Sequence, residues 1–294
     1  MLTIMGATGN IGSKLVDRLL VKNRRVKLIG RSAGRLQPFV DRGATAAVGD
    51  AGDSDFLLHA FSGSKAVFAM IPPDYAAQDF RQYQNQIGEQ IATAIEKSGV
   101  SHVVNLSSHG AHLSDKTGPI KGLRDQEQRL NQIDAAHIVH LRPTFFMENM
   151  LMNIDMIKNM GINGSHIRGN LPFAMIATED IAEVAAQYLL DRNFSGKTIS
   201  ELLGPRDISM EEATRIIGEK IGKPDLPYVH FSREEYINGL LQAGLTKDMA
   251  EQLAELDAGI NDRLFASGEP RTQENRTLTD FKQFADFFTQ VYKS

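Results

Sequence analysis

A glycine-rich loop at residues 6–12, which reads Gly-Ala-Thr-Gly-Asn-Ile-Gly, constrains the fold of this chain more than any other feature. A short apolar run at residues 2–5 precedes it, and apolar residues at helical spacing follow it. In a strand, loop and helix of this kind, the first glycine permits a tight turn, the second lets the backbone approach a pyrophosphate, and the third lets helix and strand pack closely. The helix N-terminus then faces the anion. Gly6, Gly9 and Gly12 therefore predict a dinucleotide-binding site; the alternative is a loop with a structural role alone.

Short apolar runs alternate with helical patterns through the first half of the chain. Strands are expected at residues 2–5, 25–30, 44–48, 65–71, 102–107 and 137–142. Among the intervening helices, the longest apolar stripe runs from Phe80 to Ile95 and is ended by Gly99. Alternation of this kind is typical of βαβ units. It predicts an α/β fold with a Rossmann-type, doubly wound parallel sheet.

After residue 150 the pattern loosens and helices dominate. We expect residues 1–150 to form a nucleotide-binding lobe, completed by segments near 175–204, and residues 151–294 to form a smaller, mainly helical lobe interleaved with it. In the second lobe two serine–glutamate pairs fit capping boxes, in which each side chain satisfies a free amide at a helix start: Ser209 with Glu212, and Ser232 with Glu235. The last helix carries an apolar stripe that is expected to pack into the core: Phe281, Phe284, Phe288 and Val291.

Composition narrows the class of protein. The 294 residues include 32 basic and 36 acidic side chains, and this mildly acidic balance argues against direct binding of nucleic acid, which favours a basic face. The chain has no cysteine, so disulfides, thiol catalysis and cysteine-ligated zinc are excluded. No apolar run approaches the roughly 18 to 20 residues that a membrane helix needs, and the first residues lack a secretory leader. We therefore expect a cytoplasmic protein that does not bind a membrane.

The residues after the second predicted strand bear on which dinucleotide is bound. An acidic residue at this point would accept hydrogen bonds from a free ribose 2′-hydroxyl and favour NAD. The sequence instead offers Arg31, Ser32 and Arg35, and guanidinium groups suit a 2′-phosphate. NADP is therefore the predicted cofactor, and the alternative is that both arginines are ordinary surface charges. Further along, Asp50 and Ala51 could lie beside the adenine; the alternative at this point is a helix-capping role for Asp50 or Asp53.

Several segments together resemble the NmrA-like branch of the atypical short-chain dehydrogenase/reductase superfamily. They are the loop at 6–12, Gly30-Arg31-Ser32, Asn105-Leu106-Ser107-Ser108, the segment 141–149 reading Leu-Arg-Pro-Thr-Phe-Phe-Met-Glu-Asn, Thr178 to Ala182, and the tail 277–288. The segment 141–149 is the most specific of these markers. The resemblance implies an NADP-binding Rossmann lobe, a smaller C-terminal lobe and a cleft between them. The family includes reductases of quinones or similar acceptors, and regulators that sense NADP(H) without clear turnover. If this chain were such a regulator, its NADP occupancy would alter a surface that binds a regulatory protein partner.

The resemblance also implies individual site residues. Cofactor contacts carry over to Gly6, Thr8, Gly9, Asn10, Ile11, Arg31, Ser32, Arg35, Asp50, Ala51, Ile71 and Pro72. The segment Pro143, Thr144, Phe145 and Phe146 is expected to border the nicotinamide. A binding and catalytic lysine of the family is matched approximately by Lys121.

The catalytic acid common in the superfamily is missing. None of the six tyrosines is followed four residues later by lysine, so the usual Tyr-x-x-x-Lys pair is absent. Reduction of a quinone demands less of the protein, because the ring system stabilises the incoming charge and the cofactor supplies the difficult chemistry.

Ser108 and His109 follow the fifth strand, where a hydroxyl or imidazole could donate to the acceptor, although His109 could equally be an ordinary loop residue. His109 and His112 are spaced like part of a metal site, but no metal site is expected.

These observations predict an NADP(H)-dependent oxidoreductase that passes hydride to a quinone-like or other conjugated small molecule. The alternative is an NADP(H)-sensing redox regulator with little or no turnover, for which the missing tyrosine–lysine pair is the main support.

Overall fold

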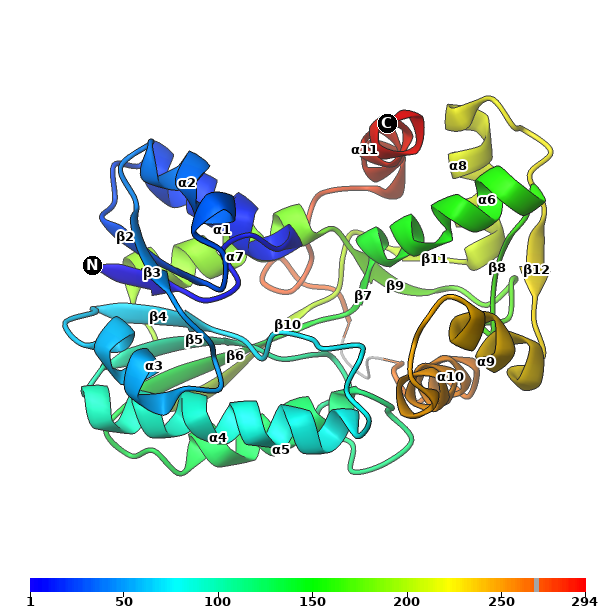
Figure 1. The fold of residues 1–294 in the computed structure, drawn as a ribbon. Coiled ribbons are helices and arrows are strands. Elements are labelled where there is room, and N and C mark those ends of the chain that lie inside the picture. Colours follow the sequence, from blue (N-terminus) through cyan, green and yellow to red (C-terminus); the bar gives the residue numbers. More distant parts are fainter. Residues whose placement is uncertain (267–269) are drawn as a thin grey trace.

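The computed structural model of the chain describes residues 1–266 and 270–294. Its centre is a seven-stranded sheet in the order β10-β6-β5-β4-β1-β2-β3, in which every neighbouring pair is parallel (Figure 1). The strands are β1 (Leu2–Ile4), β2 (Val26–Gly30), β3 (Thr45–Val48), β4 (Ala66–Ala69), β5 (His102–Leu106), β6 (His137–Pro143) and β10 (Lys197–Leu202). The direction of winding reverses between β1 and β4, which is the switch point where doubly wound sheets bind ligands. The predicted Rossmann-type fold is confirmed.

Helices cover both faces of this sheet. One face carries α1 (Asn10–Val21), α2 (Ala33–Val40) and α7 (Thr178–Asp191), and the other carries α3 (Ser54–Phe61), α4 (Phe80–Ser98) and α5 (Ile120–Asn131) (Figure 1). Successive residues of a strand point to opposite faces. In β4, Val67 therefore joins the core under α3 and α4, while Phe68 joins the core under α1 and α7, and both are fully buried. Burial on both faces explains why the strands read as continuous apolar runs.

The second lobe lies beside the carboxyl ends of the strands (Figure 1). Its helices are η1 (Met147–Asn153), α6 (Ile154–Met160), α8 (Met210–Ile221), α9 (Arg233–Gln242), α10 (Lys247–Asn261) and α11 (Phe281–Lys293). Its short strands are β7 (Phe145–Phe146), β8 (Asn163–Ser165), β9 (Phe173–Ile176), β11 (Asp207–Ile208) and β12 (Tyr228–His230). Phe281, Phe284 and Phe288 of α11 are buried in a third core cluster, as the apolar stripe predicts.

The two predicted capping boxes differ in outcome. Ser232 and Glu235 form the complete box at the start of α9. Ser209 accepts a hydrogen bond from the amide of Glu212 at 3.1 Å, but the Glu212 carboxylate pairs with Arg206 instead of returning to the cap. A nearby arginine thus competes successfully with the backbone amide for that carboxylate.

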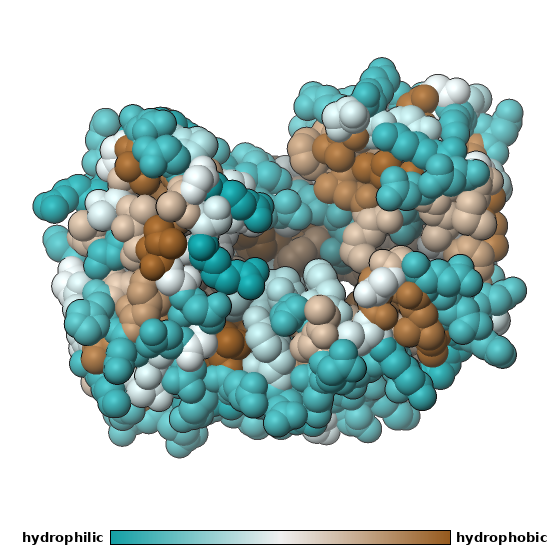
Figure 2. Space-filling view, in the orientation of Figure 1, coloured by the Kyte–Doolittle hydropathy of each residue, from teal (hydrophilic) through white to brown (hydrophobic). Residues whose placement is uncertain are grey.

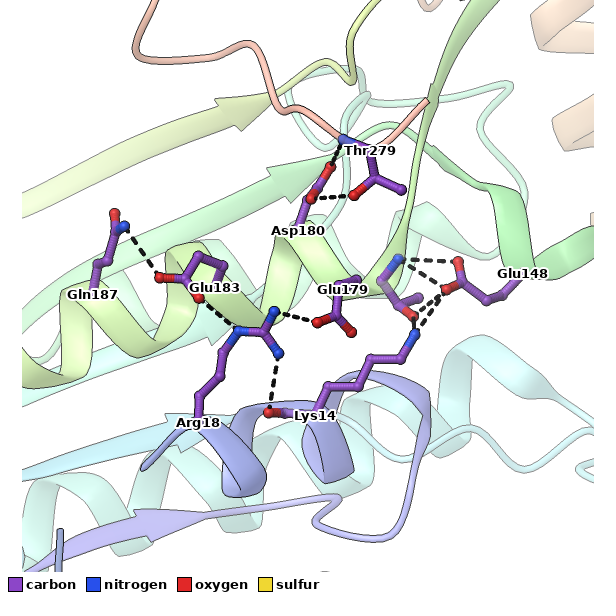
Figure 3. A network of polar contacts seen from close by, with 9 residues as sticks. Lys14, Arg18, Glu148, Glu179, Asp180, Glu183, Gln187 and Thr279 are labelled. Carbon is purple, nitrogen blue, oxygen red and sulfur yellow. Dashed lines mark hydrogen bonds and ion pairs between the residues drawn. The ribbon is translucent and has the colours of Figure 1, made fainter. Parts of the chain in front are cut away.

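The chain crosses three times between the lobes, since α7 and β10 follow the first elements of the second lobe, pack in the first, and are followed by the rest of the second. A polar network holds α7 in place (Figure 3). Glu148 of η1 accepts hydrogen bonds from the Thr178 amide at 3.0 Å and from the Lys14 ammonium at 3.0 Å, so it caps the N-terminus of α7 and ties it to α1. Arg18 of α1 pairs with two carboxylates of α7, and Asp180 accepts from the amide of Thr279 at 3.0 Å. This capping explains the glutamate in the segment 141–149. The position of the boundary at residue 150 stays a prediction.

Asp257 of α10 is buried in the second lobe, and burial raises its pKa to about 7, against hydrogen bonds from the His166 amide and the Tyr236 hydroxyl that lower it. A carboxyl in the unfolded chain has a pKa near 3.9. Between about pH 4 and pH 7 the unfolded chain therefore loses this proton while the folded chain keeps it, so the free energy of unfolding falls as pH rises through that window. Above pH 7 the cost is constant, at about 4 kcal/mol.

Replacing Asp257 with asparagine should remove this contribution. We expect urea unfolding from pH 4 to pH 8 to show a shallower loss of stability in Asp257→Asn than in the natural chain. The exposed Asp262 follows the same helix, and Asp262→Asn is the matched control, which should keep the natural slope. Parallel stability curves for Asp257→Asn and the natural chain would contradict the prediction.

Candidate functional site

A cavity of about 750 Å³ lies between the two lobes. The loops after β1, β4, β5 and β6 line one end of it, and residues of the second lobe line the other. Figure 2 shows the surface hollowed between the lobes, with apolar residues deep in the hollow. This is the crevice at the carboxyl ends of the strands where the fold places its ligands.

The glycine loop forms one wall of this cavity. Gly6 has φ of +64°, a conformation that glycine adopts readily. A Cβ on Gly12 would lie 2.0 Å from the Gly6 carbonyl oxygen, so helix and loop are in the closest contact that glycine allows. Gly9 is the N-cap of α1 and makes no side-chain cap, and the first turn carries no acidic residue. The first amides of α1 thus remain available to an anion, and the loop fits the pyrophosphate of a dinucleotide.

Most of the residues predicted for the site line this cavity. They are Gly6, Thr8, Gly9, Asn10, Ile11, Gly12, Arg35, Ile71, Ser108, His109, Thr144, Phe145 and Phe146. The structure thus brings together the loop, the ends of three further strands and the segment after β6. Their contacts with a cofactor stay predictions.

Apart from Arg35, the residues predicted to contact the adenosine do not line the cavity. Arg31 is exposed, and Ser32 caps α2 by accepting from the Arg35 amide at 3.4 Å. Asp50 accepts from the Gly52 amide at 2.7 Å, while Asp53, not Asp50, caps α3. Of the two residues offered for the capping role, Asp53 therefore fills it and Asp50 does not.

Tyr83 lies near several of these predicted residues. Burial raises the pKa of Tyr83, with smaller effects from Asp74 and Asp50 that raise it and from Arg31 that lowers it. The Tyr83 hydroxyl donates to the carbonyl of Pro72 at 2.8 Å. Tyr83 thus contacts Pro72 and lies within the electrostatic influence of Arg31 and Asp50, and Ala51, which is half-buried, follows Asp50.

Lys121 lies elsewhere. Its ammonium donates to both carboxylate oxygens of Glu255 in α10, at 3.0 and 2.9 Å, and it lines a separate polar pocket rather than the main cavity. An ammonium held by that carboxylate is directed away from the cavity, so the geometry does not support the binding and catalytic role expected of Lys121. Its observed contact instead joins α5 to the second lobe.

The two candidates after β5 differ in what their polar atoms do. His109 is buried, its Nδ1 lies 2.7 Å from a Glu201 carboxylate oxygen, and its Nε2 lies 3.0 Å from the Phe265 carbonyl oxygen. Because both ring nitrogens face acceptors, His109 fastens the loop after α10 rather than reaching for a ligand. Ser108 is half-buried, and its hydroxyl donates to the His109 carbonyl at 3.1 Å. Pro143 does not line the cavity, but its carbonyl accepts from the His109 amide at 2.9 Å and so positions this turn.

An ion-pair chain stands behind His109. Arg142 donates to both carboxylate oxygens of Glu127 at 2.9 and 2.6 Å, and also to Glu201 at 3.4 Å. Burial raises the pKa of Glu127, but the hydrogen bonds and charge of Arg142 outweigh it, so the pKa is lowered overall. Glu201 therefore bridges a fixed cation and the imidazole of His109.

Sequence reasoning missed the far end of the cavity. Its walls are apolar, and the residues involved are Phe80, Ile120, Leu123, Leu171, Phe173, Met249, Leu253, Leu256, Ile260 and Phe265. Four of them lie on one face of α10 at helical spacing, a signal that is visible in the sequence but identical to that of an ordinary core helix. Ser107 and Arg263 also line the cavity and were not predicted.

No group of three potential metal ligands gathers anywhere in residues 1–266 and 270–294. Within the same ranges, no helix has the length and apolar character to cross a membrane.

Comparisons with known proteins place the chain in a family. The model of the NmrA-like family matches residues 1–285. The NAD(P)H azoreductase of Xenophilus azovorans is 27% identical over 260 residues, which cover 88% of this chain and 86% of the relative.

Solved structures share the fold. The NADPH-dependent quinone oxidoreductase QOR2 of Escherichia coli, complexed with NADPH, superposes with a TM-score of 0.77 at 21% identity and covers 98% of this chain and 99% of its own. The triphenylmethane reductase of Citrobacter sp., complexed with NADP(H), has a TM-score of 0.78 at 20% identity and covers 98% of this chain and 100% of its own. The match across residues 1–285, on a Rossmann sheet with the expected glycine loop, confirms the predicted resemblance: the chain belongs to the NmrA-like family.

Proposed function

We propose that this chain is an NADPH-dependent oxidoreductase that transfers hydride to a quinone-like or other conjugated small molecule. The observation that carries the proposal is the continuity of the cavity, which joins the glycine loop at one end to apolar walls at the other. A cavity of about 750 Å³ lies within the range of small-molecule sites, which are mostly apolar with a few placed polar groups. Reductases of azo compounds, quinones and triphenylmethane dyes among the similar proteins support the same class of activity.

The choice of NADPH rests on charge. Arg31 and Arg35 flank the end of β2, and Ser32 between them caps α2. No carboxylate occupies residues 30–36, where a ribose 2′-hydroxyl would need one. Two guanidinium groups at this point suit a 2′-phosphate.

The residues of the chain would bind and orient rather than transfer protons. The amides at the start of α1 would hold the pyrophosphate, and Thr144, Phe145 and Phe146 would form the surface against which the nicotinamide and acceptor lie. The bound cofactor would supply the hydride. The apolar walls would exclude water, and the ring system of the acceptor would take up the charge without a tyrosine acid. Ser108 offers a hydroxyl oxygen near this point.

The test is NADPH oxidation by the purified protein with a panel of quinones and azo compounds. We expect turnover with at least one acceptor. Tight NADPH binding without any turnover would overturn the oxidoreductase and favour the NADP(H) sensor.

The cofactor is tested by Arg31→Asp, because a carboxylate there should repel a 2′-phosphate and tolerate a hydroxyl. We expect the dissociation constant for NADPH to rise by about ten- to a hundredfold, and that for NADH to change much less. Arg24→Asp is the matched control, since Arg24 precedes β2 at the opposite end of that strand, and it should leave both constants unchanged. Equal losses for NADPH and NADH would contradict the assignment.

A further inference from the structure

The apolar end of the cavity contains one arginine whose presence the fold does not require. We propose that Arg263 makes the site selective for acceptors that carry an anionic group, such as a sulfonate or carboxylate, at one edge of a flat apolar ring system. This inference rests on the proposed function, because it names the class of acceptor that the same cavity takes. It starts from the position of Arg263, which lines the cavity just beyond α10.

The backbone at Arg263 is of a kind that usually carries glycine. Asp262 is the C-cap of α10, and Arg263 follows it with φ of +57°. The Arg263 amide donates to the Ile260 carbonyl at 3.0 Å, and the Leu264 amide donates to the Gly259 carbonyl at 3.0 Å. This pair of bonds is the Schellman motif, in which glycine is favoured at the left-handed position because a Cβ there is strained. The backbone conformation at residue 263 favours glycine, so it does not explain why this residue is an arginine.

The charge of Arg263 also stands out from its surroundings. Leu256, Ile260 and Phe265 line the cavity close to it in the chain. The carboxylate that also lines the cavity, Asp207, is paired with Arg271. Within residues 1–266 and 270–294, no ion pair joins a carboxylate to Arg263.

These observations together describe a cation at the edge of an apolar wall. A guanidinium binds the oxygens of a sulfonate or carboxylate through paired, charge-assisted hydrogen bonds. Arg263 is exposed at the cavity surface, so the anionic group keeps part of its hydration and the cost of burying a charge is avoided. Contact of the flat ring system with the apolar walls, together with binding of its anionic edge by Arg263, fixes the orientation of the acceptor in the cavity. Arg263 is thus a specificity-determining residue.

The experiment compares naphthoquinone with its ring-sulfonated derivative, as acceptors for the natural chain, Arg263→Gly and Arg263→Lys. Glycine suits the helix end, so Arg263→Gly should fold with unchanged or raised thermal stability. We expect Arg263→Gly to lower kcat/KM for the sulfonated quinone by about ten- to a hundredfold and that for the neutral quinone by less than about threefold. Arg263→Lys keeps the charge and should restore much of the loss. Lys247→Ala removes a cation from the other end of α10 and should alter neither value.

A second measurement does not depend on turnover. Calorimetry with the sulfonated quinone and NADP⁺ present should show weaker binding to Arg263→Gly than to the natural chain. Equal loss for both quinones, or no loss for either, overturns the role of Arg263 and leaves the proposed oxidoreductase standing. If neither quinone is reduced but binding of the sulfonated quinone depends on Arg263, the anion site stands and the proposed function falls.

Discussion

Replacing Gly12 with alanine is expected to raise the dissociation constant for NADPH by about a hundredfold or more. The added methyl group would lie 2.0 Å from the Gly6 carbonyl oxygen and 2.7 Å from its carbonyl carbon. Both atoms belong to the backbone, so neither can rotate away, and α1 must move off the loop. This movement misdirects the amides that are proposed to hold the pyrophosphate, and it should also cost about 2–3 kcal/mol of stability through overpacking.

The measurement is calorimetric titration of NADPH, with urea unfolding of the same samples. Gly239→Ala is the matched control, because Gly239 lies inside α9 with no atom within 4 Å of its added Cβ. That variant should bind NADPH normally and gain up to about 1 kcal/mol, since alanine favours the helix. If Gly12→Ala binds NADPH as tightly as Gly239→Ala does, the assignment of the loop to the pyrophosphate is wrong.

The second large effect is expected from Glu127→Gln. Glu127 and Arg142 are 5% and 7% exposed, and their two hydrogen bonds are 2.9 and 2.6 Å long. Removing the carboxylate charge leaves a buried guanidinium with only Glu201, at 3.4 Å. Breaking a buried pair in this way costs about 3–5 kcal/mol, which lowers the melting temperature by roughly 6–20 °C in a chain of this size.

The same pair gives a pH dependence of known sign. The pKa of Glu127 is lowered in the folded chain, so its contribution is present above the unfolded pKa of about 4.3 and is lost as pH falls through the folded value. Glu127→Gln should therefore lose less stability than the natural chain below about pH 4.

Two further variants separate the pair from general effects of charge. The double variant Glu127→Leu with Arg142→Met should recover most of the stability, because apolar residues often replace a buried pair without loss. Arg215→Ala breaks an exposed pair with Glu219 and should cost less than about 1 kcal/mol. A loss that small for Glu127→Gln would disprove the importance of the buried pair.

Local patterns account for what could be predicted from the sequence. Each of the six expected strands is a short run that is read along the chain itself, and so are the apolar stripes of α1 and α4; of the strands, β1 and β4 are buried throughout, whereas the edge strand β3 is mostly exposed. The glycine loop is equally local, since its turn, its helix and its anion site lie within about ten residues.

Contacts between distant residues account for what could not be predicted. Lys121 matches the family's lysine only approximately, and Glu255, 134 positions away, accepts hydrogen bonds from its ammonium. His109 meets Glu201 and Phe265, which are 92 and 156 positions away. The short strands β7 and β11 have two residues each and give no periodic signal. Arg263 could not be assigned to the cavity until the end of α10 was placed.

The packing of α7 on α1 has a consequence for biosynthesis. Ile181, Ala185 and Leu189 of α7 belong to the same buried cluster as the apolar stripe of α1, and β6 gains its outer neighbour only when β10 is made. The ribosome must therefore synthesise roughly two thirds of the chain before the first lobe can complete its packing. Until then, the apolar stripe of α1 stays exposed in the nascent chain, where it can bind chaperones or misassemble.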